Sequence, residues 1–154
     1  MNTPCKRFVV LVIGLALPWA AGCKSGGPKM IRISGVVSYK GGPLINVTQG
    51  IVRYSPKDAA SGAREATGRI QPDGSFVMTT FQKDDGVLLG EYDITVSAYS
   101  TQLLSRQQAE SGVRAAGPKL LIPERYLKPT TSGLSDTVAA GHSGVKKIEL
   151  TDKS

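Results

Sequence analysis

The sequence predicts an all-β domain in which six or seven short strands form an antiparallel sandwich. The clearest observation is residues 90–99, GEYDITVSAY, where apolar and polar side chains alternate, as they do in a half-buried strand. Other short alternating segments are separated by glycine-rich turns. No segment sustains apolar residues at a helical spacing. These three observations favour strands along most of the chain.

The predicted strands are, in chain order, residues 31–39, 50–56, 65–71, 74–80, 90–99 and 146–151, with a weaker seventh at 135–141. The tripeptide PDG at 72–74 is typical of a tight turn and joins two of them into a hairpin. The shorter strand at 50–56 ends at Pro56, because proline lacks the N–H that a strand pair needs. In the last strand, Ile148 and Leu150 are expected to face the core.

The alternation also predicts which side chains the longest strands bury. In residues 31–39 the inner face carries Ile31, Ile33, Val37 and Tyr39. In residues 90–99 the inner face carries Tyr92, Ile94, Val96 and Ala98, and the outer face Glu91, Asp93, Thr95 and Ser97. Both sets follow from the period of two between faces of a sheet.

A segment of about 20 residues, 100–119, shows no strand pattern. Within it, LLSRQQAE at 103–110 is long enough for two helical turns at most. Loops of this length inside compact domains are uncommon and are either mobile or functional, and both alternatives stay open. The apolar run at 120–122 follows directly, so we expect the chain to return to the sandwich there.

The N-terminus has the composition of a secretory signal peptide, predicted over residues 1–22. Lys6 and Arg7 precede 15 uncharged residues, and small residues follow Pro18. A stretch of 15 residues is too short to cross a hydrocarbon core of about 30 Å, which needs about 20 helical residues. The segment therefore indicates export rather than a membrane-spanning helix.

The residues Ala20, Ala21 and Gly22, followed by Cys23, resemble a bacterial lipobox, with Ala20 at a position where leucine is usual. The resemblance implies that the Cys23 thiol receives a lipid and becomes the first residue of the mature chain. Residues 23–30 would then be the lipidated cysteine and a flexible tether, whose six residues KSGGPK reach at most about 20 Å. The alternative is a plain secreted protein with a cysteine near its start.

The use of cysteine supports lipidation. The chain has two cysteines, and Cys5 lies within the predicted signal peptide, so the mature chain keeps Cys23 alone. One cysteine cannot form an internal disulfide, although exported proteins usually pair their cysteines. Two or more acyl chains anchor a protein stably, whereas one does so marginally.

The charge balance does not indicate nucleic-acid binding. Of the 19 basic residues, two lie in the predicted signal peptide, which leaves 17 against 12 acidic residues, a net charge of +5. These cations are scattered, and Lys146–Lys147 is the only adjacent mature pair. No basic stripe with interleaved aromatic residues is present. The candidate partners of this charge are solvent, anionic lipid and wall polymer.

Six segments, taken in order along the chain, resemble a bacterial family of small envelope lipoproteins. They are SGVVSYKGGPL, GIVRYSP, IQPDGSF, GVLLGEYDITV, LIPERY and SGL. These lipoproteins carry a carboxypeptidase regulatory-like, transthyretin-like domain, and the resemblance covers residues 31–151. It implies an antiparallel seven-stranded sandwich after the signal peptide and no established activity. The matching residues are Gly35, Gly42, Pro43, Leu44, Asp73, Gly74, Phe76, Gly90, Tyr92, Pro123, Tyr126, Gly133 and Leu134.

The side chains do not suggest an enzyme. The chain has one histidine, His142, expected in an exposed loop, whereas a Ser-His-Asp triad needs a histidine that a carboxylate positions. Transthyretin-like hydroxyisourate hydrolases use several histidines and a Tyr-Arg-Gly-Ser-type terminus, but this chain ends TDKS. We expect no metal and no cofactor, and interpret residues 84–86 as a turn rather than a calcium loop.

The expected function is therefore a non-catalytic interaction or structural module, anchored by lipid to a bacterial membrane in the cell envelope. Its expected partners are the membrane, through the N-terminal lipid, and an envelope protein or glycan, but not nucleic acid. The alternative is a glycan- or peptidoglycan-binding module that uses the 100–119 loop. Tyr99 and Tyr126, on either side of that loop, are then the candidate ligand-binding pair.

Overall fold

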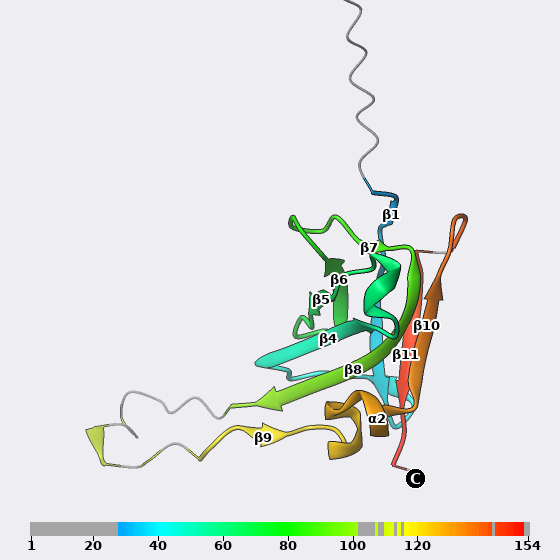
Figure 1. Ribbon diagram of the computed structural model, residues 1–154. Coiled ribbons are helices and arrows are strands. Elements are labelled where there is room, and N and C mark those ends of the chain that lie inside the picture. The colour runs from blue at the N-terminus through cyan, green and yellow to red at the C-terminus, as the bar shows by residue number, and fades with distance from the viewer. Residues whose placement is uncertain are drawn as a thin grey trace, which may run out of the picture.

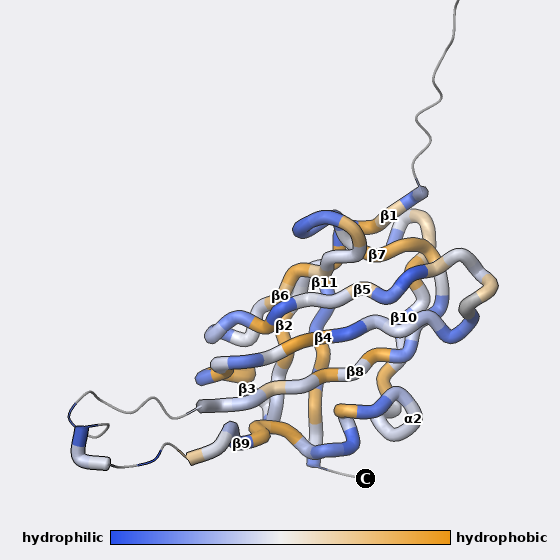
Figure 2. The backbone as a smooth tube through the Cα atoms, turned by 60° about the vertical axis from the view of Figure 1, so that its left-hand side comes forward, coloured by the Kyte–Doolittle hydropathy of each residue, from blue (hydrophilic) through white to orange (hydrophobic). Residues whose placement is uncertain are grey.

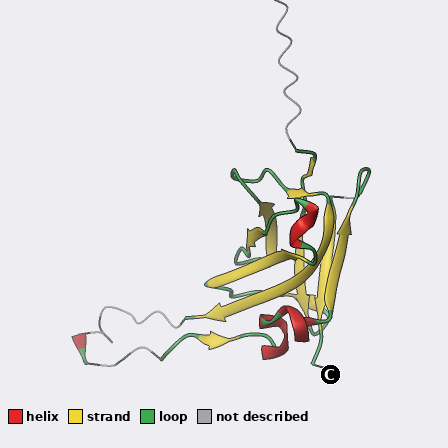
Figure 3. Cartoon of the chain, viewed as in Figure 1, coloured by secondary structure: helices red, strands yellow, loops and turns green. Residues whose placement is uncertain are grey.

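The computed structural model describes residues 28–101, 107, 110–112, 114, 116–142 and 144–152. The predicted signal peptide, the lipobox with Cys23 and most of the 100–119 segment lie outside the described residues. Figure 1 shows a domain built mainly of strands, and Figure 3 shows its helices as short segments beside them. The prediction of an all-β fold is confirmed for the described part of the chain.

The elements follow the predicted order. The strands are β1 (Met30–Ile31), β2 (Ser34–Tyr39), β3 (Gly42–Pro43), β4 (Gln49–Pro56), β5 (Ala66–Arg69), β6 (Ser75–Thr79), β7 (Val87–Leu88), β8 (Gly90–Ser100), β9 (Lys119–Leu120), β10 (Leu134–Val138) and β11 (Val145–Leu150). The helices are η1 (Ala59–Ser61), η2 (Glu124–Leu127) and α2 (Pro129–Ser132).

The main sheet has the strand order β10-β8-β4-β5-β6-β2-β11, with β3 beside β2 and β9 beside β8. It curls around the core, so that β10 and β11 come close to one another although neither pairs with the other (Figure 1). A separate two-stranded ribbon joins β1 to β7. The strand predicted at 31–39 is thus two strands: its first residues leave the main sheet to pair with β7.

One strand pair departs from the antiparallel prediction. β11 runs parallel to β2, from Ser34 opposite Val145 to Tyr39 opposite Leu150. The close pairing depends on Gly35, because a Cβ there would lie 2.0 Å from the carbonyl oxygen of Lys146. The glycine therefore explains how β11 closes this edge of the sheet.

The core contains most of the side chains that the alternation predicts, although Ile31 and Tyr39 in the first predicted strand are only partly buried. Tyr92, Ile94, Val96 and Ala98 on β8 are all buried, as are Ile148 and Leu150 on β11. Tyr54 on β4 packs against Tyr92, with ring centroids 5.7 Å apart. Figure 2 shows the apolar stretches recurring along most strands, including β2, β4 and β8.

The outer face of β8 is partly covered, which the sequence pattern does not predict. Thr95 points away from the core and is nevertheless buried, because η2 and α2 pack against β8. The return of the chain at 120–122 is confirmed: β9 pairs Leu120 with Tyr99, and Ile122 is buried in the core. The turn before β6 is also confirmed, with the backbone of Gly74 in the left-handed region at φ 85°.

Candidate functional site

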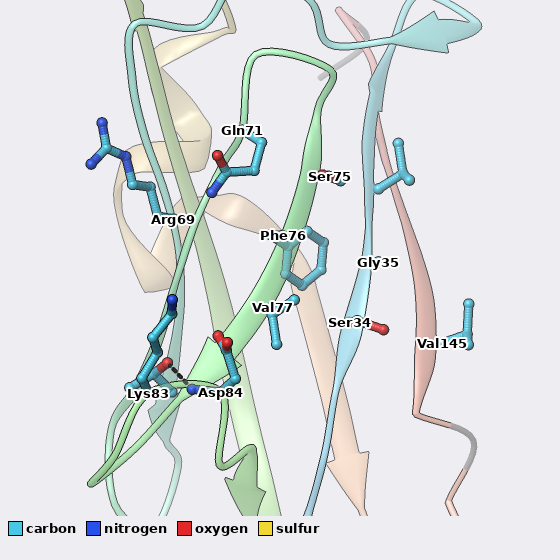
Figure 4. Close-up of a pocket in the computed structure, with 12 residues that line it drawn as sticks. Ser34, Gly35, Arg69, Gln71, Ser75, Phe76, Val77, Lys83, Asp84 and Val145 are labelled. Atoms are coloured by element: carbon cyan, nitrogen blue, oxygen red, sulfur yellow. Dashed lines mark hydrogen bonds between the residues drawn. The ribbon is translucent and has the colours of Figure 1, made fainter.

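An open hollow lies on the outer face of β2, β6 and β11, and Figure 4 shows it. Its volume is about 780 Å³. We call it the valine hollow. Its lining residues are Ser34, Gly35, Val36, Arg69, Gln71, Ser75, Phe76, Val77, Thr79, Lys83, Asp84 and Val145.

The floor of the valine hollow is apolar because valines occupy positions that alternation assigns to solvent. Val36 and Val77 stand on the outer faces of β2 and β6, where their neighbours in sequence, Val37 and Phe76, are buried. Val145 begins β11 beside them and is 76% exposed. The three valines form an apolar patch on one face of the sheet. Such patches on soluble domains commonly mark binding surfaces.

Charged side chains border this floor. Arg69 stands on one side and Lys83 on the loop after β6, as Figure 4 shows. Among the residues that the structure describes, neither cation has an ion-pair partner. Asp84 also lines the rim, where its N–H donates to Thr79 Oγ1 at 3.0 Å. The hollow therefore offers an apolar surface with two free positive charges and one negative charge at its edge.

A second hollow, of about 410 Å³, lies on the outer face of β4 and β8. Tyr99 lines it together with Leu127, and most of its other lining residues are polar or charged, including Arg53, Ser55 and Glu65. The Arg53 guanidinium and the Glu65 carboxylate form an ion pair at 3.1 Å. We call this region the tyrosine hollow.

Tyr126, the other residue of the predicted ligand-binding pair, does not share this exposed surface. It is 2% exposed, and its hydroxyl accepts hydrogen bonds from the Thr151 N–H at 2.9 Å and from Arg125 at 2.6 Å. Burial alone would raise its pKa, but these hydrogen bonds outweigh it and hold the pKa of Tyr126 below the usual value. Its position in η2 turns the ring into the core, so an exposed Tyr99–Tyr126 platform is not formed.

A cluster of polar side chains joins β4, β10 and β11 around Asp136, whose side chain is 10% exposed. The Lys146 ammonium donates to Asp136 Oδ1 at 2.8 Å, and the Tyr54 hydroxyl donates to Oδ2 at 3.3 Å. Burial, with Asp136 as the second cause, raises the pKa of Tyr54 well above its usual value. We call these residues and His142 the Asp136 cluster.

His142 is less exposed than the sequence predicts, with a side chain 16% exposed. Its Nε2 lies 3.7 Å from Asp136 Oδ2 and has no hydrogen-bond partner among the described residues. The loop between β10 and β11 turns the imidazole towards the carboxylate of β10, which explains its burial. Within the described ranges, no three histidine, cysteine, aspartate or glutamate residues are grouped in a way that could hold a metal ion.

Comparison with known families, curated proteins and solved structures found no match. In the part of the chain that the structure describes, no helix is long and apolar enough to cross a bilayer. The sequence pattern was not used to predict the valine hollow or the Asp136 cluster. The valine hollow is visible in that pattern, because Val36 and Val77 interrupt the polar faces of their strands. The Asp136 cluster left none, since Tyr54 lies 82 residues before Asp136 and the pairing of Asp136 with Lys146 depends on how the sheet curls.

Proposed function

We propose that this chain is a lipid-anchored, non-catalytic interaction module of a bacterial envelope. In this proposal Cys23 carries the lipid, and residues 31–151 form a transthyretin-like, carboxypeptidase regulatory-like sandwich. The seven-strand path of the main sheet supports that fold assignment. The lipobox and the single mature cysteine support the anchor. The domain would therefore act within about 20 Å of a membrane surface.

The exposed apolar floor of the valine hollow is the observation that carries the interaction role. Its partner is proposed to be an envelope protein that inserts apolar side chains between Val36, Val77 and Val145. Acidic residues flanking that segment would meet Arg69, whose charge is unpaired within the described residues. Burying the three valines would provide the hydrophobic centre that a protein interface needs.

The anchor is tested by metabolic labelling with an alkyne fatty acid, comparing the wild type with Cys23→Ala. Label and membrane association should both disappear in the variant. An unlabelled, soluble wild type would contradict the anchor and leave a freely diffusing secreted domain.

The interaction role is tested with a photoreactive amino acid placed in cells at Val145. The matched control places it at Ile45, which is 56% exposed and lies outside both hollows. One discrete cross-linked product should form from position 145 and not from position 45. Equal cross-linking at the two positions would count against the valine hollow as a binding site.

The second candidate function is glycan or peptidoglycan binding, and the tyrosine hollow favours it. An aromatic ring beside polar side chains suits a sugar, which presents both apolar C–H groups and hydroxyls. Retention on insoluble cell-wall polysaccharide should then depend on Tyr99, and Tyr99→Ala should abolish it. If the wild type is not retained, glycan binding is removed from consideration.

A further inference from the structure

The loop between β6 and β7, residues 80–86, holds the most exposed aromatic side chain of the described chain. Phe81 is 59% exposed. Lys83, two residues later, is also exposed. An exposed aromatic ring beside a cation is the side-chain pair with which peripheral proteins enter a lipid interface.

The loop holds Phe81 in a fixed position. The Asp85 carboxylate accepts hydrogen bonds from the backbone N–H groups of Thr80, Phe81 and Gln82, at 2.7, 2.8 and 2.7 Å. The Thr80 hydroxyl donates to the carbonyl of Gly86 at 2.6 Å. Burying an aromatic side chain from such a loop costs little conformational entropy, because the backbone is already ordered.

These hydrogen bonds also satisfy the negative charge of Asp85. Desolvation opposes its ionisation, but the three N–H donors outweigh desolvation and lower the pKa of this carboxyl. The carboxylate is directed at its own loop, so its charge is offset by backbone dipoles. Of the two acids that follow Lys83, Asp85 has its hydrogen-bonding capacity largely used, whereas Asp84 keeps its charge on the rim of the valine hollow.

The loop lies at the end of the domain where the N-terminal segment arrives. The Arg32 guanidinium donates to the carbonyl oxygen of Asp84 at 3.0 Å. Gly86 packs so closely that a Cβ there would lie 2.2 Å from the carbonyl oxygen of Ile31. Figure 1 shows β1 and the loop that leads into β7 at the same end of the domain.

The distance to the proposed lipid is short. Residues 24–29 separate Cys23 from β1 and reach at most about 20 Å when extended. Lys29 in this segment and Arg32, directly after β1, also add positive charge at this end of the chain. Anionic headgroups attract such cations near a membrane surface, by about 1 kcal/mol each.

We infer that the 80–86 loop docks on the membrane, with Phe81 inserted into the interface and Lys83 and Arg32 against anionic headgroups. The inference rests on the proposed lipid anchor, which would hold this end of the domain next to the bilayer. Docking would fix the orientation of the domain, so that the valine hollow, whose rim includes Lys83, opens beside the membrane surface.

A tryptophan at position 81 reports this docking directly. The only tryptophan of the chain, Trp19, lies in the predicted signal peptide, so a mature Phe81→Trp variant would carry a single indole. The lipidated mature product is reconstituted in vesicles of phosphatidylcholine and phosphatidylglycerol in equal parts. Its emission should shift to the blue, and lipids brominated on the acyl chains should quench it.

The matched control is Ile45→Trp, because Ile45 is 56% exposed and follows β3, which pairs with the far end of β2. Its indole should stay in water and remain unquenched. On phosphatidylglycerol vesicles, Lys83→Gln should lower the docked-to-free ratio of the Phe81→Trp protein about fivefold. On phosphatidylcholine alone, this substitution should have little effect.

Fatty-acid labelling separates the two proposals. If the protein is labelled and the two indoles are equally exposed to water, the docking inference fails and the anchor stands. If the protein is unlabelled, the anchor fails. The same variants added to anionic vesicles then test the loop alone, and absence of quenching there overturns the docking as well.

Discussion

The Asp136 cluster and the valine hollow reverse the usual distribution of side chains. In the first, charged groups are mostly buried between β4, β10 and β11. In the second, valines face solvent on β2, β6 and β11. A buried ion pair is costly to break, whereas an exposed valine adds little to folding. We therefore expect the cluster to contribute more to the stability of the curled sheet than the exposed valines do.

The largest expected effect is on the Asp136 cluster. Asp136→Ala removes the partner of Lys146 and the acceptor of the Tyr54 hydroxyl, and leaves a partly buried ammonium unpaired. We expect a loss of about 3 kcal/mol in the free energy of unfolding, measured by urea denaturation. Replacing both partners by apolar residues, with Asp136→Leu and Lys146→Met, should recover much of this loss. A change below about 0.5 kcal/mol in Asp136→Ala would mean that the cluster does not close the sheet.

The next effect concerns how β11 is held against β2. Gly35→Ala places a Cβ 2.0 Å from the Lys146 carbonyl oxygen, so the two strands must separate. We expect a loss of about 2 kcal/mol, measured by thermal and urea unfolding. Gly42→Ala is the matched control, because a Cβ at Gly42 meets no atom within 4 Å. Equal stability of the two variants would show that the parallel pairing tolerates a side chain at position 35.

The valine hollow should behave in the opposite way. Val36→Ser and Val77→Ser remove methyl groups from side chains that are 37% exposed, so the free energy of unfolding should fall by less than about 1 kcal/mol. The same variants should abolish the cross-link formed from position 145. If stability falls by more than about 1 kcal/mol while the cross-link persists, the valines support folding rather than binding.

The contrast between the two regions also separates what could be predicted from sequence from what could not. The period of two in residues 90–99 predicted β8 and its buried face, because alternation is local. The parallel pairing of β11 with β2 was missed, since nothing near residues 145–150 encodes which edge they join. Tyr126 was predicted to lie on the surface. Its burial depends on η2 and on Thr151, 25 residues later, and the local sequence pattern does not show these contacts.

The predicted exposure of His142 and Tyr99 differs from the structure for one common reason. His142 was expected in an exposed loop, and the loop is real, but Asp136 on the preceding strand draws close to its imidazole. Tyr99 does line a hollow, although the residues that shape it come from β4, η2 and α2. A single sequence shows the residue type and the local element, and the long-range neighbours then decide exposure.

The smallest expected effect concerns the 80–86 loop, a third region besides the Asp136 cluster and the valine hollow. It tests whether this loop is ordered on its own. Three backbone N–H groups lower the pKa of Asp85, so this carboxyl binds its proton more weakly in the folded chain than in the unfolded one. Its stabilising contribution is therefore fully present above the unfolded pKa of about 4 and is lost as the pH falls through the lower folded pKa. Following the side-chain resonance of Asp85 by NMR should give a midpoint below the ordinary value for an aspartate, and the amide signals of Thr80, Phe81 and Gln82 should shift with it. Asp85→Asn should remove the titration from those three amides and leave the signals of β10 and β11 unchanged. If the amides of the 80–86 loop titrate at the ordinary pKa of a carboxyl, the loop is not held by Asp85 and Phe81 is not presented in a fixed position.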